Sequence, residues 1–263
     1  AGPGEWAPGE PPRMARVSRE QRSRAKGEFH VKRLAVANQK GGVGKTTTAI
    51  SLAAALSVLE KRVLLVDFDP QGNTTGGLGV EKGSLEKTVY DWILGNASLG
   101  EVARPTELAG LSLIPASRDL VGAEIELVGV EEREYLLRRK LDGLPEEFDY
   151  VFVDCPPSLG LLTLNALTAA DGVLVPIQCE YYALEGVSEL ISTIERVREG
   201  LNPTLAIAGV VATMLDERLN LSRQVLEEIR RYFGEAFLEP PVPRNVRLGE
   251  APSFGKPIFL YDI

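Results

Sequence analysis

The chain has 263 residues, which is long enough to bury a substantial core in one large domain or two small ones. Its 44% hydrophobic and 25% charged residues are typical of a globular protein, and no apolar run approaches the roughly 18–20 residues that span a bilayer. Two cysteines are too few for a disulfide framework and the N-terminus has no apolar signal segment, so a cytoplasmic protein is favoured over a secreted one.

The net charge of −8 is distributed unevenly along the chain. Residues 1–33 carry eight basic and four acidic side chains, a balance of +4, which leaves −12 for the rest. A body this acidic does not bind nucleic acid through bulk charge. Any contact with DNA must therefore use a local basic patch.

Residues 1–30 are rich in Gly, Pro, Arg and Glu and almost free of aliphatic side chains. Such a segment cannot bury enough apolar surface to offset its ordering entropy, so we expect a disordered basic tail. The chain begins without Met, and Met14 lies inside the tail. Residues 1–13 are therefore either an expression remnant or an extended gene start, and both alternatives stay open.

From Lys32 onward, short aliphatic runs alternate with helical patterns, as in βαβ units around a parallel sheet. The predicted strands are 34–37, 63–66, 111–114, 150–153, 172–176 and 206–211. The predicted helices are 46–59, 117–128, 132–141, 158–169, 184–199 and 221–232. With no repeat and no linker, residues 31–263 are predicted to form a single α/β domain with a mostly parallel twisted sheet flanked by helices. The chain stops just after the apolar run 258–261, so a closing C-terminal helix is not expected.

The most specific motif is a glycine-rich loop between the first predicted strand and the first predicted helix, with the sequence Lys40-Gly41-Gly42-Val43-Gly44-Lys45-Thr46-Thr47. Glycines let the backbone turn its N–H groups toward phosphates, and the N-terminus of the helix adds attraction. In such a loop Lys45 reaches the β- and γ-phosphates of a nucleotide, and the Thr46 hydroxyl ligates Mg²⁺. The alternative is a glycine-rich loop that binds no ligand.

Carboxylates follow two of the predicted strands, at the sheet edge where ligands bind in parallel α/β folds. Asp67 and Asp69 come after strand 63–66, and strand alternation sends both to one side, opposite Phe68. Asp154 ends strand 150–153, where an acid holds Mg²⁺ through water in phosphate-loop enzymes. The alternatives are two solvated strand-end aspartates and an aspartate that caps helix 158–169.

The phosphate loop departs from the common pattern because Gln39 stands where its first Gly would be, and a second lysine, Lys40, opens the motif. In this the chain resembles the deviant Walker A ATPases, which include ParA, MinD, the nitrogenase iron protein and the arsenite-pump ATPase. The resemblance implies that Lys40 reaches across a nucleotide-sandwich dimer to the partner's phosphates, as an arginine finger does. It also implies that Asp69 positions or activates the attacking water and that Asp67 orders the Mg²⁺ shell. The alternative for Lys40 is a solvated loop lysine.

Within this group the chain most resembles the ParA or Soj chromosome-partitioning ATPases, from Lys32 to Tyr261. The segments that support this are 162–167, 178–186 and, above all, 243–252, which begins Pro243-Arg244-Asn245-Val246-Arg247. The resemblance implies that Pro243 and Asn245 lie at the adenine, where an ordinary loop is the alternative. It also implies that Arg218 and Arg247 grip DNA phosphates, with Arg244 a further candidate. Surface arginines are common, so solvated side chains are the alternative.

The resemblance implies an ATP-hydrolysing switch for chromosome or plasmid partitioning, with ATP and Mg²⁺ as cofactors. Its expected partners are a second copy of itself, non-specific double-stranded DNA and a ParB-type protein, and its expected place is the cytoplasm, on the nucleoid. A MinD-like ATPase that works on a membrane surface is the first alternative, although that branch uses a C-terminal amphipathic helix. A biosynthetic ligase of the cobyrinic-acid type is the second, and it would need an extra substrate domain.

The two cysteines invite comparison with the nitrogenase iron protein, whose cluster lies between two subunits. Cluster ligands must meet across the dimer axis. Cys155 directly follows Asp154, the acid at the end of predicted strand 150–153, and Cys179 lies just beyond predicted strand 172–176. We therefore expect both to be core residues.

Overall fold

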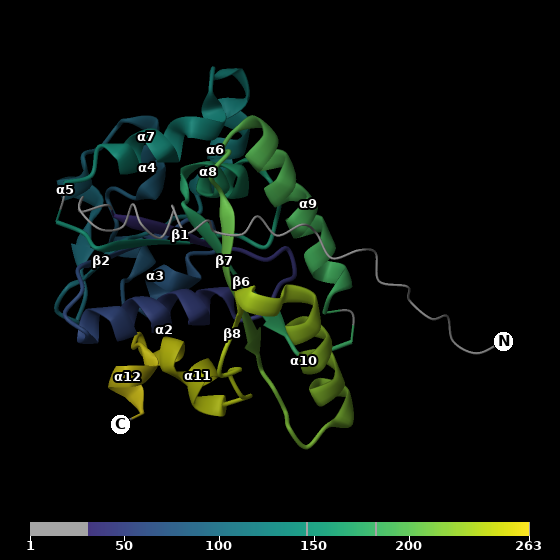
Figure 1. Ribbon diagram of the computed structural model, residues 1–263. Helices are drawn as coiled ribbons and strands as arrows, with labels where there is room; N and C mark the ends of the chain where they lie inside the picture. The colour runs from purple at the N-terminus through teal and green to yellow at the C-terminus, as the bar shows by residue number, and fades with distance from the viewer. Residues whose placement is uncertain (1–30, 146, 182, 263) are drawn as a thin grey trace.

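The computed structural model describes residues 31–145, 147–181 and 183–262. The tail predicted for residues 1–30 lies outside this part. The strands form one eight-stranded sheet in the order β3-β4-β2-β5-β1-β6-β7-β8, in which β3 is antiparallel to β4 and every other pair is parallel (Figure 1). The strand bounds are β1 Lys32–Val36, β2 Val63–Asp67, β3 Arg104–Pro105, β4 Leu111–Ile114, β5 Tyr150–Asp154, β6 Gly172–Gln178, β7 Ala206–Thr213 and β8 Phe237–Leu238.

Helices connect the strands and cover both faces of the sheet. The α-helices are α2 Lys45–Val58, α3 Asn73–Gly77, α4 Val89–Leu94, α5 Leu99–Val102, α6 Leu120–Glu126, α7 Leu136–Asp142, α8 Leu161–Ala169, α9 Glu185–Gly200, α10 Asn220–Phe233, α11 Val246–Glu250 and α12 Ile258–Tyr261. Short 3-10 helices lie at η1 Lys82–Ser84, η2 Leu127–Gly129, η3 Arg133–Tyr135, η4 Gly234–Ala236 and η5 Ala251–Phe254.

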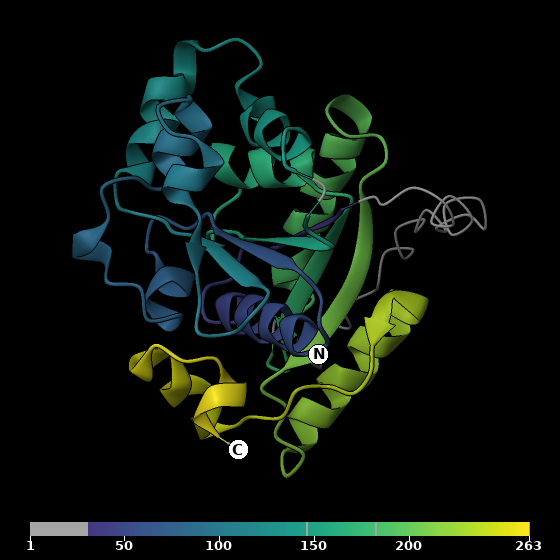
Figure 2. The same ribbon diagram turned by 90° about the vertical axis from the view of Figure 1, so that its left-hand side faces the viewer.

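The strands are apolar on both faces because helices bury both sides of the sheet. Along β1, Leu34 and Val36 join the cluster packed against α2, whereas Ala35 joins the larger cluster packed against α4, α7, α8 and α9. Figure 1 shows α2 with α11 and α12 on one side of the sheet and α4, α6, α7 and α8 on the other, and Figure 2 shows the same layers from the side.

The strand order brings the predicted site together. β5 lies between β2 and β1, so that Asp154 at its end is in register with both Asp67 of β2 and Val36 of β1. The loop after β1 is the phosphate loop, which leads directly into α2. The two predicted acid-bearing strand ends and the phosphate loop therefore meet at one edge of the sheet.

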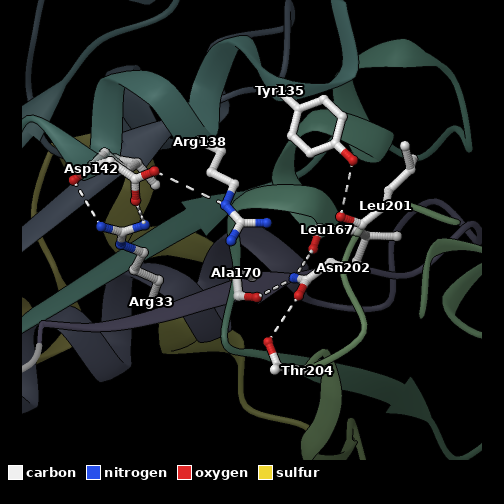
Figure 3. Close-up of polar contacts among 10 residues, drawn as sticks. Arg33, Tyr135, Arg138, Asp142, Leu167, Ala170, Leu201, Asn202 and Thr204 are labelled. Atoms are coloured by element: carbon white, nitrogen blue, oxygen red, sulfur yellow. Dashed lines mark hydrogen bonds and ion pairs between the residues drawn. The ribbon is translucent and has the colours of Figure 1, made fainter. Parts of the chain in front are cut away.

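A polar network holds the opposite edge, where strands begin (Figure 3). Arg33, at the start of β1, donates to Asp142 Oδ1 at 2.6 Å and so fastens the end of α7 to the sheet. The buried Asn202 side chain donates to the carbonyl oxygens of Leu167 (3.0 Å) and Ala170 (2.7 Å). These bonds satisfy the backbone at the end of α8, just before β6 begins, and so stabilise the frame that carries the site.

The predicted α/β fold class is confirmed, and each of the six predicted strands overlaps an observed one. The two-residue edge strands β3 and β8 are additional, because two residues carry no alternation pattern. α8 begins three residues later than predicted: its N-cap is Gly160, and the Thr163 hydroxyl donates back to the Ser158 carbonyl at 2.5 Å. The apolar run 258–261 forms the single-turn helix α12.

Candidate nucleotide and magnesium site

The phosphate loop follows β1 and includes the first three residues of α2, Lys45 to Thr47. Gly42 and Gly44 have φ angles of 74° and 89°, a left-handed conformation that residues with a side chain rarely adopt. A Cβ at Gly42 would meet no atom within 4 Å, so the loop has open space beside it. The conformation and the space are those of a loop that presents backbone N–H groups to a ligand.

Two buried side chains that the sequence motif does not include hold this loop in shape. Asn38 donates to the Pro176 carbonyl at 2.7 Å and accepts from the Lys40 N–H at 3.0 Å. Thr213 donates to the Val43 carbonyl at 2.8 Å. The loop is thus fastened to β6 and β7, and these contacts could not be recognised without the three-dimensional pairing.

Lys45 points into the protein and is 7% exposed. Its ammonium group donates to the Lys40 carbonyl at 3.1 Å, which fixes it beneath the loop. Burial lowers the pKa of Lys45, while the negative charges of Asp154 and Asp69 act to raise it. The predicted phosphate-binding lysine therefore lies close enough to Asp154 and Asp69 for their charges to affect its pKa.

Asp154 is fully buried at the end of β5. Its Oδ2 accepts from the hydroxyls of Thr46 at 2.8 Å and Thr74 at 2.7 Å, whereas Oδ1 is buried without a hydrogen-bond partner in the described part of the chain. Burial, more than any neighbouring charge, raises the pKa of Asp154 to about 6. The N-cap of α8 is Gly160 and no side chain caps the helix, so Asp154 is not the capping residue that the alternative supposed.

These atoms fit a magnesium ion. Mg²⁺ takes oxygen ligands, keeps several waters and is held in such sites by one or two protein groups together with phosphates. The Thr46 hydroxyl and the unpartnered Asp154 Oδ1 are oxygen atoms that can ligate Mg²⁺ in this way. Among the described residues no group of three or more His, Cys, Asp or Glu side chains could hold a metal by itself, so the protein offers a partial set of ligands.

Asp67 is also fully buried, but its oxygens are occupied by the chain. Oδ2 accepts from both the N–H (2.7 Å) and the hydroxyl (2.6 Å) of Thr75, and Oδ1 accepts from the Asp69 N–H at 3.3 Å. Burial first, and the adjacent Asp154 second, raise the pKa of Asp67 to about 7. Asp67 thus ties the start of α3 to β2, beside Asp154.

Asp69 lies two residues beyond Asp67 and is 5% exposed. Its Oδ1 accepts from the Gln71 N–H at 2.9 Å, and its carbonyl accepts from the Gly72 N–H at 2.8 Å. The turn that follows β2 therefore holds its carboxylate close to Lys45 and Asp154, whose pKa values respond to its charge.

A pocket of about 640 Å³ opens beside the loop. Gly44, Thr47, Pro243 and Asn245 all line it, so the residues predicted for phosphate and for adenine border one cavity. Asn245 also caps α11, because its side-chain oxygen accepts from the Arg247 N–H at 2.8 Å. Further lining residues from the end of β7 and from α11 and α12 were not predicted, namely Thr213, Met214, Leu248 and Ile258.

Lys40 lies at the surface of the loop. Its ammonium group is 3.7 Å from Glu180 Oε2, and Arg244 is 3.6 Å from the other oxygen of the same carboxylate. Glu180, which follows β6, is thus shared between the second loop lysine and the segment that borders the pocket. It is a functional candidate that the motif did not indicate.

Each arginine predicted to contact DNA has a carboxylate partner. Arg218 is 87% exposed and forms a bidentate ion pair with Asp216, with hydrogen bonds of 2.8 and 2.7 Å. This pair lowers the pKa of Asp216 to about 2. Arg247 pairs with Glu250 at 3.1 Å. Backbone bonding between Arg244 and Leu215 brings the two arginine-bearing segments side by side.

Both cysteines are buried in the hydrophobic core, as predicted. Burial raises the pKa of Cys155 far above its usual range and that of Cys179 to about 11. At neutral pH both are therefore thiols, whereas metal ligation requires the thiolate.

The sequence matches a family model described as "AAA domain" over residues 31–207. It is 57% identical to the chromosome partitioning protein ParA of Myxococcus xanthus over 88% of this chain and 81% of that protein. It is 55% identical to the sporulation initiation inhibitor protein Soj of Bacillus subtilis over 87% of this chain and 90% of that protein. The chain belongs to the ParA/Soj family of ATPases. The predicted family and ATPase activity are confirmed.

Solved structures share the fold of this ParA/Soj chain. A plasmid partition protein from Borrelia burgdorferi has a TM-score of 0.70 and 28% identity, over 89% of this chain and 99% of that one. Cobyrinic acid a,c-diamide synthase from Mycobacterium smegmatis, crystallised with ADP and magnesium and also with an ATP analogue and magnesium, has a TM-score of 0.79 and 44% identity. That match covers 86% of this chain and 93% of the other. The predicted cofactors, ATP and Mg²⁺, agree with the bound nucleotides and magnesium in those two structures.

No helix among the described residues of this ParA/Soj chain is long and apolar enough to cross a membrane.

The raised pKa of Asp67 makes stability depend on pH in the protein without nucleotide. The folded pKa is about 7 and the ordinary value is 3.8, so between these values the folded chain binds the proton more tightly. The free energy of unfolding should then fall as pH rises from about 4 to 7. Asp67→Asn should flatten that decline, which amounts to about 1.4 kcal/mol for each pH unit between those two pKa values.

This prediction is measured by urea unfolding between pH 4.5 and 8 in EDTA without nucleotide. Glu101→Gln is the control, because Glu101 is exposed and its pKa is lowered by its bonds to Ser98. Parallel stability curves for wild type and Asp67→Asn would show that Asp67 is not the group responsible.

Proposed function

We propose that this chain is an ATP-hydrolysing switch for chromosome or plasmid partitioning, which dimerises with ATP and then binds DNA without sequence preference. One observation supports this most. Two lysines on one phosphate loop, Lys40 and Lys45, lie at the same sheet edge as the acids Asp69 and Asp154. Relatives named chromosome partitioning protein ParA, which are more than 50% identical over most of their length, support the same function.

Within this proposal each residue of the site has a role. The loop residues Gly41–Thr47 bind the phosphates through backbone N–H groups, and Lys45 neutralises their charge. The Thr46 hydroxyl and Asp154 hold Mg²⁺, which polarises the phosphates when bound. Asp69 orients the attacking water. Asp67 acts on the magnesium shell indirectly, because its oxygens already accept hydrogen bonds from Thr75 and the Asp69 N–H.

ATP favours the dimer in this proposal because Lys40 reaches the nucleotide of the other subunit. In the single chain its only ion pair among the described residues is the 3.7 Å contact with Glu180, on the surface. An exposed pair of this kind is worth at most about 1 kcal/mol, so it is readily exchanged for a phosphate. A cation supplied by the partner would neutralise charge on the transferring phosphoryl group.

DNA binding is proposed for Arg218 and Arg247, with Arg244 as a further candidate. Two subunits double the number of guanidinium groups, which favours the ATP-bound dimer over the monomer as the DNA-binding form. A ParB-type protein is the proposed partner that stimulates turnover, and the nucleoid in the cytoplasm is the proposed location.

Two other functions are separated by direct assays. A MinD-like ATPase would sediment with liposomes in ATP, and a partitioning ATPase with DNA. The likeness to a structure named cobyrinic acid a,c-diamide synthase favours a test for ATP-dependent amidation of cobyrinic acid. ATP-dependent sedimentation with DNA, without liposome binding and without amidation, is the expected result.

Asp69→Ala should abolish turnover while leaving ATP binding nearly intact. Loss of a group that orients or deprotonates water costs about 10²–10⁴-fold in rate, and Asp69 is not needed to bind phosphates. Phosphate release and binding of a fluorescent ATP analogue are the two measurements. The exposed Asp119→Ala is the matched control, and wild-type turnover in Asp69→Ala would exclude the assigned role.

Lys40→Ala should weaken ATP-driven dimerisation by about tenfold or more, because each subunit loses a charged hydrogen bond to phosphate. ADP binding by the monomer should be spared, since Lys45 and the loop N–H groups remain. Light scattering after size exclusion in ATP and in ADP measures both states. The exposed Lys61→Ala controls for the loss of a positive charge, and equal dimerisation of Lys40→Ala and wild type would refute the role in trans.

Arg218 and Arg247 contribute four cations per dimer, so DNA binding should fall with salt with a log–log slope of roughly −4. Affinity should drop on the order of a hundredfold between about 50 and 200 mM salt, and Arg247→Ala should halve the slope. Fluorescence anisotropy with random duplex DNA and ATP measures the slope.

Arg139→Ala is the control for these arginines, because Arg139 lies on α7, on the other side of the sheet from α11, and also pairs with a carboxylate, that of Glu132 (Figure 1). An unchanged slope in the Arg218→Ala/Arg247→Ala double variant would show that these two arginines do not contact DNA. Arg244 or the basic tail would then be the next candidates.

A further inference from the structure

Thr74 is a buried residue of the site to which the proposed function gives no role. It is the second residue of α3, the short helix that follows β2, and it is 0% exposed. Its hydroxyl donates to Asp154 Oδ2 at 2.7 Å, which joins the segment after β2 to the end of β5. A buried hydroxyl fixed on a candidate magnesium ligand is placed to control that ligand's orientation.

The two oxygens of Asp154 are used very differently. Oδ2 accepts from both Thr74 and Thr46, whereas Oδ1 is buried without a partner in the described part of the chain. The terminal torsion of an aspartate is broad and roughly two-fold, so the side chain alone does not select which oxygen faces which way. Two donors on one oxygen remove that freedom and leave the other oxygen available.

Thr74 itself is held by a buried frame that includes no residue of the phosphate loop. The neighbouring Thr75 donates through its hydroxyl to Asp67 Oδ2 at 2.6 Å, and the same hydroxyl accepts from the Ala116 N–H at 3.0 Å. These bonds connect α3 to the ends of β2 and β4. The position of the Thr74 hydroxyl is therefore fixed by contacts to the sheet. Thr46, in contrast, belongs to the phosphate loop and would also have to ligate the metal.

We infer that Thr74 is a positioning residue for magnesium, which holds Asp154 so that Oδ1 is presented to the ion's hydration shell. The inference rests on the proposed binding of a magnesium nucleotide at this site. Partners behind a metal ligand typically contribute 10–100-fold to metal affinity. Thr74 does not contact the phosphate loop through any described bond, so nucleotide binding without metal does not depend on it.

The test compares Thr74→Val, which has nearly the same shape but no hydroxyl, with Thr74→Ser, which keeps the donor. Release of N-methylanthraniloyl-ADP is followed by stopped-flow fluorescence over a series of Mg²⁺ concentrations and in EDTA. Mg²⁺ is expected to slow nucleotide release, and the Mg²⁺ concentration for half of the full effect is compared between variants. In Thr74→Val that concentration should be higher than in wild type by roughly tenfold or more. Its release rate in EDTA should equal that of wild type, and Thr74→Ser should stay within about twofold of wild type in both conditions.

Thr168→Val is the matched control. Thr168 is a 1% exposed threonine on α8 whose hydroxyl has no partner among the described residues, so its replacement removes a buried hydroxyl without touching Asp154. It should leave the Mg²⁺ dependence unchanged. Thermal melting of every variant checks the fold, and Thr74→Ala replaces Thr74→Val if the latter melts below the assay temperature.

An unchanged Mg²⁺ dependence in Thr74→Val overturns the inference. So does a change in release that is equally large in EDTA, because that would reflect a loosened pocket and not a misplaced metal ligand. Failure of the proposed function would look different, since wild type itself would then show no binding of the nucleotide or no response to Mg²⁺.

Discussion

Two carboxylates buried side by side are the constraint on which the site depends. Asp67 and Asp154 end adjacent strands in register, and both are fully buried. Burial of a charge costs several kcal/mol unless fixed donors and opposite charges compensate. Each acid has threonine donors, and the buried Lys45 lies close by, yet the pKa of each is still raised. The protein alone therefore leaves negative charge incompletely stabilised at this edge, which is the electrostatic setting that a divalent cation completes.

The positive side chains on the surface, unlike the buried acids, are exposed and paired with carboxylates. Lys40, Arg244, Arg218 and Arg247 each lie within 4 Å of a carboxylate and keep substantial exposure. Exposed pairs contribute little to stability and are weakened by salt. Such cations can exchange a carboxylate for a phosphate at low cost, whereas the buried acids and their donors cannot rearrange without disturbing the core. A rigid interior and an exchangeable exterior are what a switch driven by ligand binding requires.

The sequence predicted the central strands and the chemistry at their ends because both depend on local patterns. β2 and β5 are continuous apolar runs followed by acids, and the phosphate loop has a motif that includes its flanking elements. What it could not predict depends on pairing across the chain. Thr74 meets Asp154 from 80 positions away, and Asn38 meets Pro176 from 138 positions away. The edge strands β3 and β8 are too short to show a period, and their positions follow from the sheet that they extend.

One short segment borders the proposed nucleotide pocket and also carries two of the proposed DNA contacts. Pro243, Arg244 and Asn245 line the cavity, and Arg247 follows two residues after Asn245. Asn245 caps α11 through the Arg247 N–H, so the conformation of the pocket wall and the start of α11 are set by the same bond. A ligand that fixes the pocket wall would also restrict the backbone that carries these arginines. The ordering needed to grip DNA would then be supplied partly by the nucleotide, and the proposed binding events would be coupled through a segment of fewer than ten residues, without any motion of the sheet.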